Sequence, residues 1–175
     1  MTIKTIFLDR DGVINKDVNY LHRIEDFEFI DGIFEACLHF LNLNYQIIII
    51  TNQSGIYRGY FTESDYQKLT LWMQTQFKNN NINILDIFHC SHGPKSNCIC
   101  RKPNPGMLIE AQIKHNIDME NSWMIGDKER DITAAIAASV ENTILLNNNQ
   151  KKIPLNSNAK FIIQALEETN QLITS

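Results

Sequence analysis

Excess positive charge and long hydrophobic runs are both missing from this sequence. Sixteen Lys and Arg residues stand against 20 Asp and Glu residues, which gives a net charge of −4. No cluster of basic side chains is present that could follow a phosphate backbone. The longest purely aliphatic run, Ile47–Ile50, is far shorter than the roughly 20 apolar residues of a membrane-spanning helix. We therefore expect a protein that binds neither nucleic acid nor a membrane.

Cysteine is also scarce, with 4 residues in 175. The charged stretch Asp9–Asp11 comes before a signal-peptide apolar region could develop, so we expect a cytoplasmic protein with reduced thiols. Three of the cysteines crowd into one short segment beside a histidine, which indicates metal ligands rather than a disulfide framework. The members of this segment are Cys90, His92, Cys98 and Cys100.

The overall composition is typical of a globular protein. Hydrophobic residues make up 43% and charged residues 21% of the chain, which excludes intrinsic disorder and collagen-like repetition. At roughly 150 residues per domain, the length favours one domain over residues 1–175. We also expect this domain to be a monomer.

Short apolar runs alternate with segments of helical periodicity. The runs predict strands at about Lys4–Leu8, Tyr45–Ile50, Ile84–Phe88, Trp123–Ile125 and Thr143–Leu146. The periodic segments predict helices at about Gly32–Leu43, Glu63–Phe77, Gly106–His115, Asp131–Ala138 and Phe161–Leu172. Thr62 and Asp65 resemble a capping box, and Asn79–Asn83 and Asn147–Asn149 are predicted to be loops. The alternation predicts an α/β fold with a doubly wound, Rossmann-like parallel sheet, whose ligands bind at the carboxyl ends of the strands.

Polar side chains follow several of these strands. Asp9 and Asp11 follow the first, Thr51 follows the second, Asp127 follows the fourth, and Lys102 comes just after the Cys/His segment. A solvated Asp-Gly turn would explain the first pair alone, but not the convergence of the whole set. The set supplies what phosphoryl transfer requires: a carboxylate nucleophile, a second carboxylate for proton transfer, a hydroxyl and a cation for the phosphoryl oxygens, and acids for Mg²⁺.

Four motifs in this order resemble those of the haloacid-dehalogenase-type phosphatases. They are Phe7-Leu-Asp-Arg-Asp-Gly-Val, Thr51-Asn-Gln-Ser-Gly, Arg101-Lys-Pro and Gly126-Asp-Lys-Glu-Arg-Asp. The Cys-x-His and Cys-x-Cys pairs before Arg-Lys-Pro resemble those of its capless heptose bisphosphate phosphatase branch. The intervals between the motifs are each filled by a predicted helix and strand, which leaves no room for a cap domain.

The resemblance implies a Mg²⁺-dependent phosphatase that acts on a small sugar phosphate. It would remove the 7-phosphate of D-glycero-D-manno-heptose 1,7-bisphosphate during the synthesis of ADP- or GDP-heptose for lipopolysaccharide. Asp9 would attack phosphorus and form an aspartyl-phosphate, while Asp11 would protonate the leaving oxygen and later activate water. Thr51 and Lys102 would hold the phosphoryl oxygens. Mg²⁺ would bind Asp9, the backbone carbonyl of Asp11, and Asp127.

The resemblance also implies a substrate-binding set of loop residues. Asp131 is expected to orient Lys128 or a loop rather than to touch the metal. Asn19 stands where the resemblance leads us to expect glycine, and asparagine enters the left-handed region more readily than most residues. The implied set is Asp17, Val18, Asn19, Tyr20, Asn52, Gln53, Ser54, Arg101 and Lys128.

Thiolates and an imidazole favour tetrahedral Zn²⁺, and four protein ligands leave no open position for water. We therefore expect a structural zinc site in a loop at about residues 90–102, where it would stiffen the chain that carries Arg101 and Lys102. Free, reduced thiols are the alternative. Cys37 lies on the apolar face of a predicted helix with Phe34, Leu38 and Leu41, and is expected in the core. The zinc ligands would be Cys90, His92, Cys98 and Cys100.

Two other functions fit parts of this pattern. Histidinol-phosphate phosphatase is the nearer, because its related domain also resembles this chain in the zinc loop and the Arg-Lys-Pro motif; the loop Asn15–Tyr20 discriminates the two. A catalytically silent zinc-binding adaptor is the other. Intact Asp9, Asp11, Lys102 and Asp127 argue against the adaptor, since clustered carboxylates repel one another and have no use without catalysis.

Overall fold

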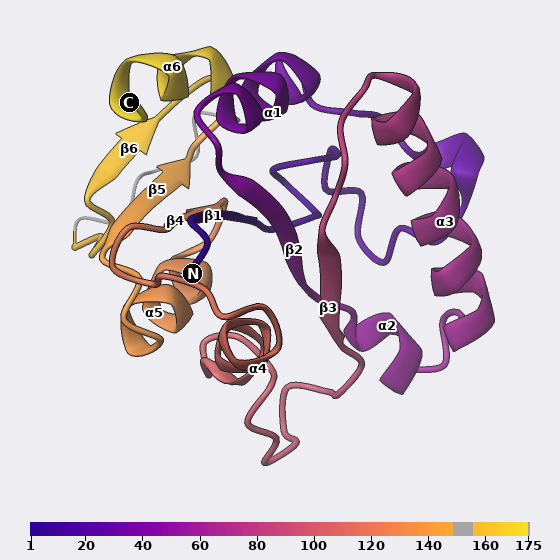
Figure 1. Ribbon diagram of the computed structural model, residues 1–175. Coiled ribbons are helices and arrows are strands. Elements are labelled where there is room, and N and C mark those ends of the chain that lie inside the picture. The colour runs from indigo at the N-terminus through magenta and orange to yellow at the C-terminus, as the bar shows by residue number, and fades with distance from the viewer. Residues whose placement is uncertain (149–155, 175) are drawn as a thin grey trace.

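The strands of the chain form one parallel sheet in the computed structural model, which describes residues 1–148 and 156–174 (Figure 1). The strand order β3-β2-β1-β4-β5-β6 reverses direction between β1 and β4. In such sheets this reversal point opens a crevice at the carboxyl ends of the two strands. The strands are β1 (Thr5–Leu8), β2 (Gln46–Asn52), β3 (Asp86–Cys90), β4 (Trp123–Gly126), β5 (Asn142–Leu146) and β6 (Phe161–Ile163).

The central strands are buried on both faces. All four residues of β1 and the run Ile47–Ile50 of β2 are buried, with Leu8 paired to Ile49 on one side and to Ile125 on the other. Parallel strands covered on both faces have continuous apolar runs rather than alternating ones. The five strands predicted from the sequence are therefore confirmed, each within about two residues at its ends.

Helices cover both faces of the sheet. One core layer contains buried side chains of α1 (Ile33–Asn42), α3 (Glu63–Asn79) and the C-terminal segment, and the other contains those of α4 (Gly106–His115) and α5 (Glu129–Ala137). Figure 1 shows α1 on the opposite side of the sheet from α4 and α5. The remaining short helices are η1 (Ile24–Asp26), α2 (Ser54–Tyr57), η2 (Leu166–Glu168) and α6 (Thr169–Leu172). Within the part of the chain that the structure describes, no helix has the length and hydropathy of a membrane span.

Two local predictions for these helices are confirmed. The backbone N–H of Asp65 donates to Thr62 Oγ1 at 3.1 Å and that of Thr62 donates to Asp65 Oδ2 at 2.9 Å, which is the capping box expected before α3. Cys37 is fully buried in the core under α1, where burial raises the pKa of its thiol. Leu38 was expected on the same face but is 38% exposed.

The helix predicted at Phe161–Leu172 is wrong. The segment starts as strand β6, whose Ile163 pairs with Leu146 at the edge of the sheet. The backbone N–H groups of Gln164 and Ala165 then donate to Glu168 Oε1 at 2.7 and 2.9 Å, which turns the chain into η2 and α6. Apolar periodicity alone could not separate a buried edge strand followed by a short helix from one continuous helix.

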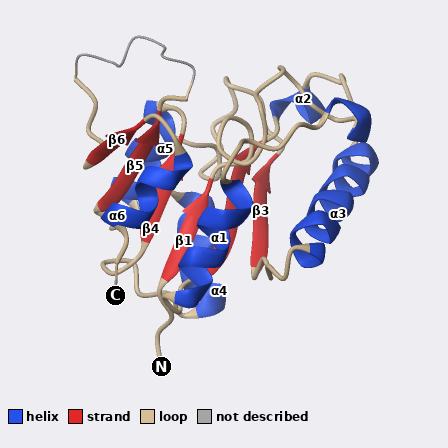
Figure 2. Cartoon of the chain, turned by 90° about the horizontal axis from the view of Figure 1, so that it is seen from above, coloured by secondary structure: helices blue, strands red, loops and turns tan. Residues whose placement is uncertain are grey.

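The two predicted asparagine loops are found mainly as expected. Asn79 is the last residue of α3, and the loop follows it. Asn147 and Asn148 lie beyond β5 outside regular structure, while Asn149 lies outside the described residues. Figure 2 shows the connections gathered along the carboxyl-end edge of the strands, with the two chain ends on the opposite side. This crowded edge is where the predicted functional residues meet.

Candidate active site

The carboxyl ends of β1 and β4 bring three acidic side chains together. Asp9 directly follows β1 and Asp127 directly follows β4, while Asp131 lies in the first turn of α5. Oxygens of these three carboxylates lie within 4.8 Å of one another. Because like charges this close repel, the cluster requires positive charge from its surroundings.

Lys102 supplies one such charge. Its Nζ lies 2.9 Å from Asp9 Oδ1 and 2.8 Å from Asp131 Oδ1, and donates to the carbonyl oxygen of Ile50 at 2.6 Å. The side chain is almost completely buried. The amide of Asn52 holds the main chain of Lys102 through two hydrogen bonds of 3.0 and 3.1 Å. The predicted nucleophile and the predicted phosphate-binding lysine are therefore in direct contact.

Burial and mutual repulsion shift the pKa values of this cluster. Burial, reinforced by the neighbouring Asp131 carboxylate, raises the pKa of Asp9 to about 7 despite the Lys102 ammonium. Burial also raises the pKa of Asp127. For Lys102, burial acts to lower the pKa, but the carboxylates of Asp131 and Asp9 outweigh it and hold the pKa above the usual value.

Glycine at position 12 allows Asp127 to approach the end of β1. Gly12 has φ of 94°, and a Cβ there would lie 2.4 Å from Asp127 Cγ. Any other side chain would displace the carboxylate and would also strain the backbone. Asp127 Oδ1 is buried and accepts no hydrogen bond from the described residues. An unpaired, buried carboxylate oxygen beside two further carboxylates fits a hard divalent cation such as Mg²⁺.

A cavity of about 250 Å³ is lined by Asp11, two residues after Asp9, and by Lys128, the residue after Asp127. Val18, predicted to bind substrate, does not line it; this side chain is 51% exposed and borders a different cavity. Gly55, Arg58, Pro94 and Arg130 line the cavity without having been predicted. The predicted residues that do line it are Asp11, Asp17, Asn19, Tyr20, Asn52, Gln53, Ser54, Arg101 and Lys128.

The loop on one side of this cavity has an unusual backbone. Asn19 and Tyr20 have consecutive positive φ values of 52° and 57°. Asparagine tolerates this region, as expected, whereas for tyrosine it costs on the order of 1–2 kcal/mol. The Tyr20 ring packs edge-on against Tyr60 with centroids 4.6 Å apart, and the Arg58 guanidinium lies 5.8 Å from its centre. These contacts hold Tyr20 at the rim of the cavity.

Lys128 connects the same loop to the acidic cluster. Its ammonium pairs with Asp127 and lies 3.2 Å from Asp17 Oδ2. Its backbone N–H donates to Asp131 Oδ2 at 3.1 Å. This contact is the one expected if Asp131 orients Lys128, and the role of Asp131 relative to the metal stays a prediction. The ion pair of Asp131 with Lys102 was not expected from the sequence.

The Cys/His segment forms a compact cluster at the end of β3. Cys90 Sγ lies 3.8 Å from Cys98 Sγ, 3.2 Å from Cys100 Sγ and 3.4 Å from His92 Nδ1. Two thiolates bound to one tetrahedral zinc ion at about 2.3 Å each are about 3.8 Å apart. The four ligand atoms therefore fit a zinc ion. Arg101 Nη1 donates to the carbonyl oxygen of His92 at 3.2 Å, so the cluster is linked to the cavity.

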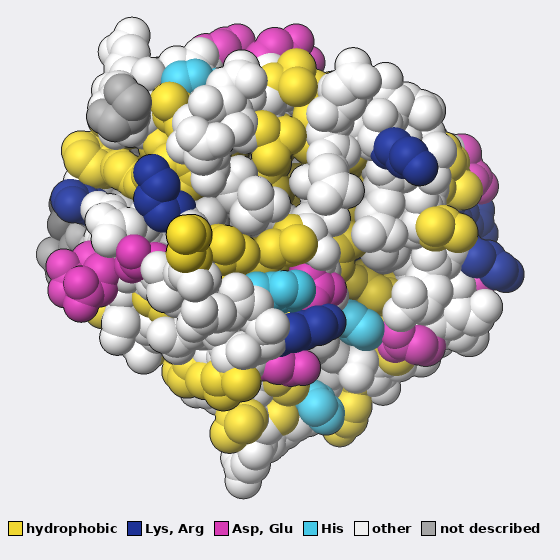
Figure 3. Space-filling model, in the orientation of Figure 1, with side chains coloured by type: hydrophobic (Ala, Val, Ile, Leu, Met, Phe, Trp, Pro, Cys, Tyr) yellow, Lys and Arg dark blue, Asp and Glu magenta, His cyan; other side chains and the backbone are white. Residues whose placement is uncertain are grey.

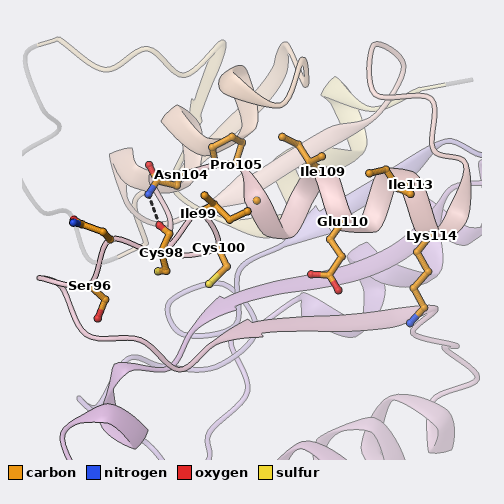
Figure 4. A pocket seen from close by; sticks show the side chains of 12 residues that line it. Ser96, Cys98, Ile99, Cys100, Asn104, Pro105, Ile109, Glu110, Ile113 and Lys114 are labelled. Carbon is orange, nitrogen blue, oxygen red and sulfur yellow. Dashed lines mark hydrogen bonds between the residues drawn. The ribbon is translucent and has the colours of Figure 1, made fainter.

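A larger cavity lies elsewhere. It measures about 960 Å³ and runs from the Cys/His loop along α4 (Figure 4). Ile99 before the helix and Ile109, Glu110, Ile113 and Lys114 of α4 line it. Its lining contains neither Asp11 nor Lys128, whereas the smaller polar cavity is lined by both.

Comparison with known proteins identifies relatives of this chain. A HAD-hydrolase-like family model matches residues 99–169. The chain is 48% identical to a D-glycero-beta-D-manno-heptose-1,7-bisphosphate 7-phosphatase of Helicobacter pylori, over 87% of this chain and 89% of that protein. It is 49% identical to a D-glycero-alpha-D-manno-heptose-1,7-bisphosphate 7-phosphatase of Campylobacter jejuni, over 87% of each.

A solved structure extends the likeness to the whole fold. The D,D-heptose 1,7-bisphosphate phosphatase of B. bronchiseptica, in complex with magnesium and phosphate, superposes with a TM-score of 0.84 at 26% identity over 97% of each chain. The two relatives above are nearly half identical to this chain over most of its length, which establishes common family membership. This chain therefore belongs to the D-glycero-D-manno-heptose-1,7-bisphosphate 7-phosphatase family of HAD-like hydrolases.

Proposed function

We propose that the chain is a Mg²⁺-dependent phosphatase that removes the 7-phosphate of D-glycero-D-manno-heptose 1,7-bisphosphate, in the synthesis of ADP- or GDP-heptose for lipopolysaccharide. The observation that carries the proposal is the buried contact of 2.9 Å between Asp9 and Lys102. The neighbouring residues Asp11 and Arg101 line a cavity with two further guanidinium groups. A carboxylate can attack a phosphate dianion only where positive charge offsets their repulsion. Relatives named for the beta and the alpha anomer match equally well, so the proposal covers both.

The proposed reaction has two steps. An oxygen of Asp9 attacks phosphorus, the ester bond breaks, and the leaving sugar oxygen takes a proton from Asp11. A water molecule then gives a proton to Asp11 and attacks the aspartyl-phosphate, which releases phosphate and regenerates Asp9. Thr51 and Lys102 contact the transferring phosphoryl oxygens throughout.

Mg²⁺ would be held by Asp9, the backbone carbonyl of Asp11, and Asp127. When bound, it neutralises charge on the phosphoryl group and orients it for attack. The unpaired Asp127 Oδ1 supports this assignment. Zn²⁺ would be held by the Cys/His cluster, where four protein ligands give it a structural role. That role is to fix the loop that carries Arg101 and Lys102.

Three arginines support a substrate with a second phosphate. Arg58, Arg101 and Arg130 line the same cavity as Asp11, and none of them pairs with a carboxylate among the described residues. Burial lowers the pKa of Arg101, and the nearby Arg130 and Arg58 charges lower it further. Guanidinium groups that share a cavity without anionic partners favour a phosphate ligand. The 1-phosphate of the substrate would fill this role.

The fold supports an open site without a lid. The described residues form one sheet, so we propose that residues 1–175 act as a single capless domain. Selectivity then rests on loop residues around the cavity, with Asp17, Asn19 and Tyr20 facing the sugar. The expected monomeric state and cytoplasmic location stay predictions.

A phosphate-release assay tests the proposal. Heptose bisphosphate of both anomers, histidinol phosphate and fructose bisphosphate are compared with and without Mg²⁺. We expect Mg²⁺-dependent release that is at least about tenfold more efficient for heptose bisphosphate than for histidinol phosphate. Histidinol phosphate as the best substrate would contradict the heptose assignment, and no release from any ester would favour the silent adaptor.

Variants of the cavity test the role of the arginines. Arg58→Ala and Arg101→Ala should each reduce the preference for heptose bisphosphate over a small phosphate monoester by about tenfold or more, because each removes a charged hydrogen-bond donor. Arg23→Ala is the matched control, since Arg23 is exposed and does not line the cavity. Equal losses for both esters would show that the arginines do not bind the second phosphate.

A further inference from the structure

Arg10 is the largest fully buried side chain of the described residues. Its guanidinium contacts Asp11 through Nε at 3.2 Å to Oδ1 and through Nη2 at 3.0 Å to each carboxylate oxygen. Nη2 also lies 3.2 Å from the carbonyl oxygen of Leu21 and 3.4 Å from Gln53 Oε1. Burying a guanidinium is unfavourable unless it is paired with a counter-charge. Among the described residues, Asp11 in its ionised form is that counter-charge.

The carboxylate of Asp11 receives further donors on the same side. Asn15 Nδ2 donates to Oδ1 at 2.9 Å, and Gln53 Nε2 donates to Oδ2 at 3.1 Å. Asn15 is fully buried and Gln53 nearly so. Together with Arg10, these side chains fix both oxygens of Asp11 from the interior of the protein.

The orientation of Arg10 favours its contact with Asp11 but leaves one of its own nitrogens without a hydrogen bond. Its Nη1 is buried and has no hydrogen-bond partner among the described residues. The guanidinium lies 6.0 Å from the centre of the Tyr66 ring, so its environment is partly aromatic. Buried donors normally have hydrogen-bond partners, so the unpaired Nη1 is unfavourable for Arg10 itself. The observed placement instead directs two nitrogens at Asp11.

The other side of Asp11 is open. A quarter of its side chain, 25%, is exposed, and it lines the cavity that also contains Arg58 and Arg101. We propose that Arg10 is a positioning residue which, with Asn15 and Gln53, holds the Asp11 carboxyl group toward the leaving group of the substrate. This inference rests on the proposed role of Asp11 as the acid and base of the reaction. It also reassigns the side chain of Gln53 from substrate binding to the support of Asp11.

Proton transfer predicts a specific signature for the loss of Arg10. In the first step the phosphorus–oxygen bond breaks as the leaving oxygen takes the proton of Asp11. A sugar alkoxide is a poor leaving group and needs that proton, whereas p-nitrophenolate departs without one at neutral pH. A misdirected Asp11 therefore slows hydrolysis of a sugar phosphate far more than hydrolysis of p-nitrophenyl phosphate.

The experiment compares kcat/KM for two esters: the sugar phosphate that the wild-type protein hydrolyses best, and p-nitrophenyl phosphate. Arg10→Lys keeps the charge but cannot make the same paired contacts. The ratio of kcat/KM for the sugar phosphate to kcat/KM for p-nitrophenyl phosphate should therefore fall at least about tenfold. Asn15→Ala removes one donor without removing a charge and should lower the ratio less. Phe40→Leu is the control, because it loosens the core at α1 away from the site and should leave the ratio unchanged.

The outcomes separate this inference from the proposed function. A lower ratio in Arg10→Lys or in Asn15→Ala supports the positioning role. An unchanged ratio in both, with or without an equal loss for the two esters, would show a purely structural role and overturn it. Wild-type protein that hydrolyses neither ester would instead overturn the phosphatase proposal, and this inference with it.

Discussion

Lys102 and Asp131 form an ion pair of 2.8 Å in which the lysine side chain is 1% exposed and the aspartate side chain 0%. The pair joins the loop after the Cys/His cluster to the start of α5, and it places the lysine ammonium against Asp9. Gly126 makes this possible, since a Cβ there would lie 2.3 Å from Asp131 Cβ. The position of Lys102 therefore depends on a residue outside the predicted catalytic set.

Removing the charge of Asp131 should weaken both the fold and the reaction. Asp131→Asn leaves Lys102 buried with one carboxylate instead of two, so we expect the free energy of unfolding to fall by about 3 kcal/mol and turnover to fall at least about tenfold. Urea denaturation and phosphate release measure the two effects. Asp26→Asn, at an exposed site, is the control. A loss no larger than that of the control would contradict the positioning role of Asp131.

Replacing the nucleophile should abolish turnover without unfolding the protein. In Asp9→Asn an amide cannot attack phosphorus, while its shape is nearly the same and Lys102 retains Asp131. Phosphate release is measured beside a circular dichroism spectrum that verifies folding. Folded Asp9→Asn protein with activity within about tenfold of wild type would rule out the covalent mechanism.

Loss of one zinc ligand should weaken substrate binding more than chemistry. Purified wild-type protein should contain about one zinc per chain, as one four-ligand cluster requires. Cys98→Ser should contain less, and its KM should rise more than its kcat falls, because the loop with Arg101 loosens. Cys37→Ala protein is the control and should contain as much zinc as wild type, because Cys37 lies in the core. Active, reduced wild-type protein without zinc would contradict the structural role.

Acid should weaken the ion pairs of Asp86 at the amino end of β3, on the opposite side of the sheet from the candidate site. Asp86 Oδ2 lies 2.8 Å from Lys114 Nζ and 2.7 Å from His115 Nε2, and Figure 3 shows basic, acidic and histidine side chains gathered over this region between β3 and α4. Burial acts to raise the pKa of Asp86, but these donors outweigh it and hold the pKa below its usual value. Its stabilising contribution is therefore complete above a pH of about 4, the unfolded value, and is lost as pH falls through the lower folded value.

The matching measurement is the difference in Tm between wild type and Asp86→Asn across acidic pH. We expect wild type to have the higher Tm at neutral pH and the difference to shrink once the pH falls below about 4. A difference that grows with acidity would have the wrong sign for a carboxylate with a lowered pKa.

The sequence predicted the strand ends of the site because local patterns determine them. Apolar runs that stop at Asp9, Thr51 and Asp127 specify both the strands and the edge where they end, and parallel pairing brings that edge together. The Cys/His cluster was predictable for the same reason, since all four ligands lie within one short segment.

Contacts between distant segments were not predictable in this way. The ion pair of Lys102 with Asp131 and the approach of Arg58 and Arg130 to one cavity depend on how loops pack, which no local spacing records. A signal existed for Asp131, which lies four residues after Asp127 at the start of a helix. Val18 was predicted to bind substrate together with its neighbours. Asp17 and Asn19 line the cavity, but Val18 does not.

The central claim is tested most directly by identifying which of the two phosphates of heptose bisphosphate the protein removes. Heptose bisphosphate is incubated with the protein and Mg²⁺, and the product is identified by phosphorus nuclear magnetic resonance. If Asp9 attacks the 7-phosphate while Arg58, Arg101 and Arg130 hold the other phosphate, the product is heptose 1-phosphate and one equivalent of inorganic phosphate. Heptose 7-phosphate as the product, or loss of both phosphates at similar rates, would contradict the account.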